Sequence, residues 1–128
     1  YRRFLLELHQ ELEQSLDVPL ILHICGNTID RMPYISETGM AAFHFDSRND
    51  PIEAMKAVDG KIRLVGNINN PTTLYARGPN EVREEVFKAL NAGVQIIAPE
   101  CAIPLKTKAE NLIEIPVAVE DWVAERTG

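Results

Sequence analysis

Pro19-Leu-Ile-Leu-His-Ile-Cys25 is a short apolar run that ends at Gly26, a pattern that predicts a buried strand. Three more apolar segments of similar length follow, each separated from the next by a helical stretch; they occupy residues 40–45, 62–66 and 94–98. Strands that alternate with helices at this spacing pair in parallel through crossover connections. The sequence therefore predicts an α/β fold with four successive strand–helix units.

Capping signals predict where the intervening helices begin. Asp50 followed by Pro51 is typical of a helix start, and Asn80 and Thr107 are expected to cap two later helices. A first helix is expected over residues 2–16, where apolar residues recur at helical spacing. Each strand–helix unit spans about 25–40 residues, which is the scale of one unit of a TIM (β/α)₈ barrel.

The length of the chain bears on this barrel interpretation. With 128 residues, the chain is about half as long as the roughly 250 residues that such a barrel needs. Four parallel strands alone would leave pairing groups and apolar surface exposed at both sheet edges. We expect either further chain or a second copy, in a homodimer, to cover those edges.

Composition argues against several classes of protein. Thirteen Lys and Arg residues against nineteen Asp and Glu residues give a net charge of −6, which argues against binding to nucleic acid. No apolar run approaches the roughly 18 residues that span a bilayer, so no membrane partner is expected. Two cysteines are too few for a disulfide-stapled secreted scaffold. We expect a reduced, cytoplasmic protein.

Polar or reactive side chains stand at the carboxyl end of every predicted strand. Taken strand by strand, they are His23 and Cys25, His44 and Asp46, Asn67, and Cys101. His23 and Cys25 are two residues apart on one strand, so their side chains share a face. In parallel α/β folds, binding and catalytic groups gather at the carboxyl ends of the strands. The pattern predicts a functional site at this rim.

One imidazole and two thiolates form a suitable ligand set for Zn²⁺, which accepts both nitrogen and sulfur donors. His23 and Cys25 would supply two ligands from one strand, and Cys101 joins them only if the fold brings the first and last strands together. Three protein ligands leave a fourth position open, which is typical of a catalytic zinc site.

Simpler interpretations stay open at this point. A free cysteine is among the most buried residue types, and a histidine near a strand end is usually a hydrogen-bonded structural residue. A Cys/His nucleophile pair, or an acid–base pair of Asp46 and His44, would also place reactive groups at the rim. Asp46 alone is equally well explained as a capping or solvated acid.

The stretch His-Ile-Cys-Gly-Asn-Thr at residues 23–28 resembles the uroporphyrinogen decarboxylase superfamily, and within it the methylcobamide:coenzyme M methyltransferase branch. Residues 61–68 are similar to the superfamily's glycine–asparagine strand end, and residues 71–92 to its next helix. Residues 97–111 resemble the segment that carries the last metal ligand. The resemblance covers nearly the whole chain, and its specific part is the His-x-Cys pair with a distal Cys.

The resemblance implies zinc-dependent methyl transfer. The family's zinc ligands, which are its catalytic residues, fall on His23, Cys25 and Cys101. A thiol such as coenzyme M would take the open position and attack a methylcobamide, a methylated corrinoid that a separate corrinoid protein carries. Asp46 is the best match to an acidic residue that completes the zinc shell when no thiol is bound. Asn67 and His44 are expected to bind substrate.

The resemblance also implies that residues 1–128 are a single domain, the C-terminal half-barrel of a longer protein, and it leaves open whether this half is active without the N-terminal half. Glu100 departs from the small residue expected before Cys101, and a carboxylate beside a thiolate raises the thiol's pKa unless a cation offsets it. Two other hypotheses remain: a metal-free decarboxylase acting on a porphyrinogen, and a non-catalytic fragment that binds zinc or a corrinoid protein. The thiols favour the methyltransferase, because metal-free decarboxylation does not need them.

Overall fold

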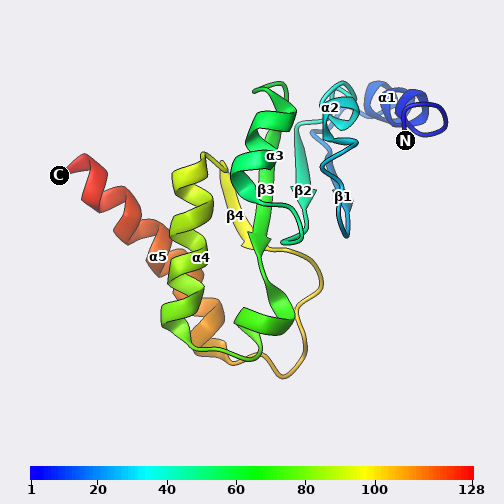
Figure 1. Ribbon diagram of the computed structural model, residues 1–128. Coiled ribbons are helices and arrows are strands. Elements are labelled where there is room, and N and C mark those ends of the chain that lie inside the picture. The colour runs from blue at the N-terminus through cyan, green and yellow to red at the C-terminus, as the bar shows by residue number, and fades with distance from the viewer.

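The computed structural model describes residues 1–128 and contains one sheet of four strands (Figure 1). The strands are β1 Ile21–Ile24, β2 Ala42–Phe45, β3 Arg63–Ile68 and β4 Ile96–Pro99. They lie in the order β1-β2-β3-β4, and each neighbouring pair is parallel. Because all four strands run in one direction, their carboxyl ends meet at the same end of the sheet. The predicted α/β fold with four strand–helix units is confirmed.

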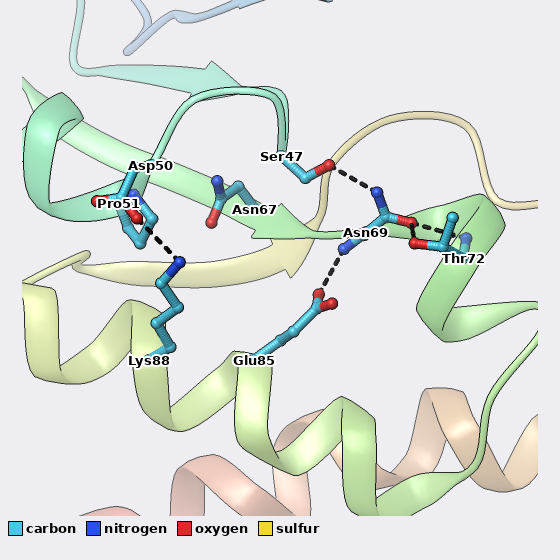
Figure 2. A pocket seen from close by; sticks show the side chains of 8 residues that line it. All are labelled: Ser47, Asp50, Pro51, Asn67, Asn69, Thr72, Glu85 and Lys88. Atoms are coloured by element: carbon cyan, nitrogen blue, oxygen red, sulfur yellow. Dashed lines mark hydrogen bonds and ion pairs between the residues drawn. The ribbon is translucent and has the colours of Figure 1, made fainter.

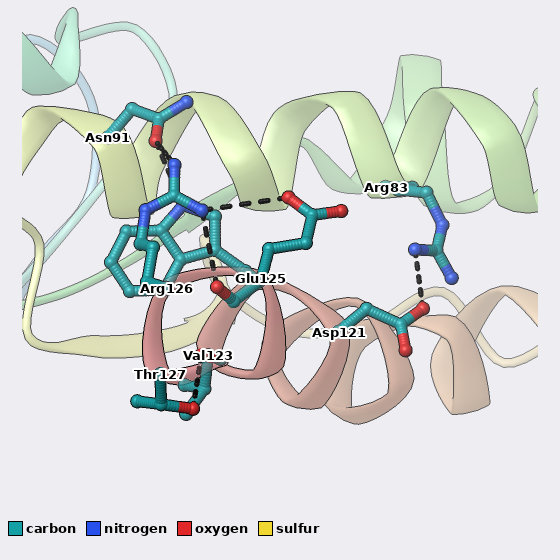
Figure 3. Close-up of polar contacts among 8 residues, drawn as sticks. Arg83, Asn91, Asp121, Val123, Glu125, Arg126 and Thr127 are labelled. Atoms are coloured by element: carbon teal, nitrogen blue, oxygen red, sulfur yellow. Dashed lines mark hydrogen bonds and ion pairs between the residues drawn. The ribbon is translucent and has the colours of Figure 1, made fainter.

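Helices lie before, between and after the strands. They are α1 Leu6–Ser15, α2 Met32–Ile35, α3 Pro51–Val58, the π-helical turn η1 Asn70–Leu74, α4 Pro79–Ala92 and α5 Ala109–Thr127. Helices α4 and α5 lie side by side (Figure 1), and Arg83 of α4 forms ion pairs of 2.7 Å with Glu114 and Asp121 of α5. Near the end of α5, Trp122 donates a hydrogen bond to Asn91. Arg126 donates another to the same side-chain oxygen (Figure 3). These contacts hold the last helix against its neighbour.

The core lies between the sheet and its helices. Its main cluster includes fully buried side chains of β2, β3, α2 and α3, among them Phe43, Phe45, Leu64, Met32, Ile35 and Val58. A second cluster joins β3 to η1, α4 and α5 and contains Ile68, Leu74, Val82, Val86, Ile115 and Ala118. Because side chains alternate along a strand, His23 and His44 belong to the opposite face from Phe43 and Phe45. The fold thus directs the two histidines away from the apolar core.

Apolar side chains remain exposed at the sheet edges and on α1. Ile21 of β1 is 57% exposed and Ile96 of β4 is 44% exposed, while Leu8 and Leu12 of α1 are also exposed. The two termini lie beyond opposite edges of the sheet (Figure 1). The homodimer expected as one way to cover these edges gains no support from the structure.

No helix in the structure has both the length and the apolar character that a membrane crossing requires.

Two of the predicted helix caps are wrong. Helix α4 begins at Pro79 instead of after Asn80, and its N-cap is Gly78, whose N–H donates to the carboxylate of Glu81 at 3.1 Å. Proline has a backbone angle that suits the first helical position and no N–H to satisfy, so it sets the start of this helix. Thr107 does not cap α5, whose N-cap makes no side-chain hydrogen bond.

The predicted cap at Asp50 is confirmed, and it generates a stability prediction. The side chain accepts the N–H groups of Ile52 and Glu53 at 2.9 and 3.4 Å, and it pairs with Lys88 of α4 at 2.9 Å. We expect Asp50→Ala to lower the free energy of unfolding by about 1 kcal/mol, as loss of a helix cap does. Asp50→Asn keeps an acceptor oxygen and should cost less.

The charge of Asp50 adds a pH dependence to this prediction. The hydrogen bond from Lys88 is the largest influence on the pKa of Asp50 and holds it below the ordinary value of 3.8. A lowered folded-state pKa stabilises the fold above the unfolded pKa, and this contribution is lost as pH falls through the folded pKa. The difference between wild type and Asp50→Asn in urea unfolding should therefore shrink in acid. A difference that does not change with pH would contradict this electrostatic contribution.

Candidate metal centre

His23, Cys25 and Cys101 come together at the carboxyl end of the sheet. Nε2 of His23 lies 3.1 Å from Sγ of Cys25, and that sulfur lies 3.1 Å from Sγ of Cys101. All three donor atoms are within 4.8 Å of one another. Ligand atoms around a tetrahedral zinc ion are separated by about 3.5 Å, given metal–ligand lengths of about 2.0–2.3 Å. The spacing and the donor types therefore fit a zinc ion.

Strand β1 and its neighbour set the direction of the His23 ring. Nδ1 of His23 is 3.2 Å from the backbone carbonyl oxygen of His44 on β2. A carbonyl oxygen only accepts hydrogen bonds, so Nδ1 carries the proton in this contact and Nε2 keeps its lone pair on the side of the thiols. In known metal sites, the ring nitrogen that does not bind the metal usually donates a hydrogen bond of this kind, and this bond fixes the orientation of the ring.

The side chain of His44 connects β2 to the end of β4. Its Nε2 donates to the carbonyl oxygen of Pro99 at 2.7 Å, and its ring centroid is 4.4 Å from that of His23. Burial is the main reason that the pKa of His44 is lowered, so this ring is neutral at pH 7. The expected role of His44 in substrate binding stays a prediction.

The carboxylate of Asp46 is engaged by backbone groups. Its Oδ2 accepts the N–H of Gly26 at 2.8 Å, and its Oδ1 accepts the N–H of Arg48 at 2.9 Å. Burial raises the pKa of Asp46, but the hydrogen bonds from the N–H groups of Arg48 and Gly26 and the positive charge of Arg48 act against it, and the pKa stays below its ordinary value. Asp46 does not belong to the group of three clustered donor residues. Its expected role as a further zinc ligand stays a prediction.

Asn49 joins the loops that follow β1 and β2 to the end of β3, and no sequence motif pointed to this residue. Its Oδ1 accepts the N–H of Thr28 at 2.8 Å, and its Nδ2 donates to the carbonyl oxygens of Gly26 and Asp46 at 3.0 Å. Asn67, which is also buried, donates to the backbone oxygen of Asn49 at 2.9 Å. The expected substrate-binding role of Asn67 stays a prediction. In the sequence, Asn49 shows only the polar turn chemistry that precedes a helix.

The surroundings of the thiols are acidic. The pKa of Cys25 is raised, first by its hydrogen bond with Cys101, then by partial desolvation of this exposed side chain and by the negative charges of Cys101, Asp46 and Glu100. These influences favour the protonated thiol, and a bound divalent cation acts in the opposite direction because it stabilises thiolates. The electrostatics of the cluster therefore suit a cation.

A polar cavity of about 190 Å³ lies between the ends of β2 and β3 and the helices α3 and α4 (Figure 2). It is lined by Ser47, Asp50, Pro51, Asn67, Asn69, Thr72, Glu85 and Lys88. Most of these groups bond to one another, as Figure 2 shows for Lys88 with Asp50 and for Asn69 with Ser47. None of the three clustered donor residues lines this cavity.

The family model of uroporphyrinogen decarboxylase (URO-D) matches residues 1–122, so the chain belongs to this family. Among curated relatives, it is 29% identical over 125 residues to the methylcobamide:CoM methyltransferase MtaA of Methanosarcina barkeri, a match that covers 97% of this chain and 37% of that protein. It is 36% identical over 99 residues to the methylcobamide:CoM methyltransferase MtbA of Methanosarcina mazei, covering 77% of this chain and 29% of that protein.

A solved methyltransferase from Methanosarcina mazei has the same fold, with a TM-score of 0.91 and 26% sequence identity over 95% of this chain and 36% of that chain. The chain thus spans about a third of the length of the relatives it matches. The resemblance to the superfamily and to its methyltransferase branch is confirmed. The predicted fold, part of a TIM (β/α)₈ barrel, is confirmed as well. That residues 1–128 form the C-terminal half stays a prediction.

The bonds of Asn49 lead to a testable expectation. Asn49→Ala leaves the N–H of Thr28 and two carbonyl oxygens without their partner at a buried position. We expect the free energy of unfolding, measured with urea, to fall by about 1–3 kcal/mol. Asn80→Ala, at an exposed position on α4, is the matched control and should change it little. Equal effects of the two substitutions would show that Asn49 does not hold the loops together.

Proposed function

We propose that this chain carries the zinc site of a methyltransferase that moves a methyl group from a methylated corrinoid, held on a partner protein, to a thiol such as coenzyme M. The observation that carries the proposal is the convergence of His23, Cys25 and Cys101 from two distant strands. One nitrogen and two sulfur donors match a three-ligand catalytic zinc site. Similarity to methylcobamide:CoM methyltransferases supports the substrate class.

The three residues would hold zinc through Nε2 of His23 and the sulfurs of Cys25 and Cys101, and they leave one position for the acceptor thiol. When bound, zinc stabilises a thiolate at neutral pH. The carbonyl of His44 keeps the proton of His23 on Nδ1, so Nε2 is available as a donor. In the transfer, the acceptor sulfur forms a bond to the methyl carbon as the methyl–cobalt bond breaks, and the electron pair of that bond stays with the corrinoid.

Asp46 would serve as the alternative ligand when no thiol is bound. Its Oδ2 accepts the N–H of Gly26, the residue that follows the ligand Cys25. Exchange of this single hydrogen bond would free a carboxylate oxygen next to the cluster, while Oδ1 keeps its bond to the N–H of Arg48.

A decarboxylase that acts without metal is the second candidate, and the family's description favours it. The paired thiols argue against it, because decarboxylation of a porphyrinogen without metal has no use for two sulfur donors beside an imidazole. A fragment that binds zinc or a corrinoid protein without turnover is the third candidate. Turnover separates it from both enzymes.

Zinc content tests the site directly. We expect the purified protein that carries this chain to hold about one zinc ion per chain by elemental analysis. Cys25→Ser, Cys101→Ser and His23→Ala should each lose most of it. His9→Ala is the control, because His9 lies on α1 and bonds to Tyr1 instead. Undiminished zinc in both cysteine variants would overturn the site.

Turnover tests the reaction. With coenzyme M as acceptor, the zinc-loaded protein should demethylate free methylcobalamin, followed by the change in corrinoid absorbance. Cys101→Ser should lower the rate by about 100-fold or more, since even residues that only support metal ligands contribute 10–100-fold. Release of carbon dioxide from a porphyrinogen, with no thiol-dependent demethylation, would establish the decarboxylase in its place.

A further inference from the structure

Glu100 is a buried carboxylate that bonds to two loops other than its own. It is 6% exposed and stands directly before Cys101. Its Oε2 accepts the N–H of Ser47, in the loop after β2, at 2.8 Å, and its Oε1 accepts the N–H of Asn70, after β3, at 2.9 Å. Both oxygens therefore satisfy backbone donors that no strand or helix partner reaches.

Cys101 depends on such contacts more than the other two members of the cluster do. His23 lies within β1 and Cys25 directly follows it, whereas Cys101 lies in a bend two residues beyond the end of β4. Hydrogen bonds to the residues on either side of Cys101 fix its position in place of strand pairing. On the N-terminal side, Nε2 of His44 donates to the carbonyl oxygen of Pro99 at 2.7 Å.

Asn70 holds the chain on both sides of Cys101. Its Nδ2 donates to the carbonyl oxygen of Ala102 at 2.8 Å, and its backbone N–H donates to Glu100. The backbone N–H of Glu100 in turn donates to the carbonyl oxygen of Ile68 at 2.9 Å. The residues before and after Cys101 are thus tied to the end of β3, and only Cys101 is left to face the cluster.

We propose that Glu100 is a positioning residue for Cys101: its carboxylate bridges the N–H groups of Ser47 and Asn70 and so places the Cys101 sulfur opposite Cys25. The inference rests on the proposed zinc site. A carboxylate suits this role because both of its oxygens accept, and charged acceptors make the stronger hydrogen bonds. The small residue expected here would leave both N–H groups without a partner.

Glu100→Gln tests the proposal because it keeps the shape of the side chain and removes one acceptor. We expect the zinc affinity of the purified protein, measured by competition with a chelating dye, to fall by about 10–100-fold. With Co²⁺ in place of zinc, the thiolate-to-cobalt absorption should weaken, since the Cys101 sulfur is less well placed. If this variant does not fold, Glu100→Asp keeps the charge but is too short to span both N–H groups, and the same results are expected.

Glu85→Gln is the matched control. Glu85 on α4 also accepts a backbone N–H, that of Asn69 at 2.7 Å, and the hydroxyl of Thr73, but it adjoins no member of the cluster. We expect its zinc affinity and cobalt spectrum to match those of the wild-type protein.

A second measurement needs no metal. In the metal-free protein, the sulfurs of Cys25 and Cys101 are 3.1 Å apart, so diamide should close them to a disulfide, taking up the two thiol hydrogens and becoming the hydrazine. Glu100→Gln should slow the closure step by about tenfold, because the two sulfurs are held together less often. Glu85→Gln should not slow it.

The outcomes separate the two proposals. A wild-type protein that binds neither zinc nor cobalt overturns the proposed function, and the rate of disulfide closure then decides the positioning role alone. Zinc binding by the wild type with equal affinity in Glu100→Gln overturns the positioning role and leaves the proposed function standing. Equal losses in Glu100→Gln and Glu85→Gln also overturn it, because they indicate general destabilisation.

Discussion

Parallel hydrogen bonding of four strands in chain order is the constraint on which the candidate site depends. The register pairs His23 of β1 with His44 of β2. Strand β3 is parallel to β2, and β4 is parallel to β3. Cys25 and Cys101 are 76 positions apart in the sequence, yet their sulfurs are 3.1 Å apart. No local interaction connects them. The carboxyl ends of parallel strands share one end of the sheet. Strands β1 and β4 are its two edge strands, so the two sulfurs meet only because Cys101 lies in the loop after β4, which hydrogen bonds to Ile68 and Asn70 at the end of β3.

The loops at that end have no strand partners, and polar side chains satisfy their backbone groups instead. Asp46 and Asn49, in the loop after β2, each accept an N–H group of the loop after β1. Glu100, after β4, accepts an N–H group of the loop after β2. Buried backbone donors require such partners. As a result, Asp46, Asn49 and Glu100 already hydrogen bond to backbone groups of the loops. The donor atoms of His23, Cys25 and Cys101 instead lie within 4.8 Å of one another.

The same acids affect the chemistry of the thiols. Asp46 and Glu100 add negative charge near Cys25, whose pKa is raised. Without a cation, this negative charge disfavours the thiolate forms of the cysteines. A bound divalent ion stabilises the thiolates, and the nearby carboxylates then add to its attraction to the site. Membership of the uroporphyrinogen decarboxylase family does not by itself distinguish a metal-free enzyme from a zinc enzyme. The donor set of His23, Cys25 and Cys101 is the observation that supports the proposed zinc site.

The sequence by itself determined the α/β class, the strand order along the chain and the shared face of His23 and Cys25, because these follow from periodicities of two or three to four residues. It also determined the cap at Asp50 but misplaced the one at Asn80, where the adjacent proline sets the helix start. Local signals of this kind act within a few residues.

Only the tertiary structure decided the approach of Cys101 to Cys25 and the partners of Asp46. The roles of Asn49 and Glu100 were likewise invisible in the sequence, where Glu100 is an unexplained acid beside a thiol. Its partners Ser47 and Asn70 lie 53 and 30 positions away. A hydrogen bond over such a separation depends on the packing of several strands, and no pattern in the residues near Glu100 encodes it.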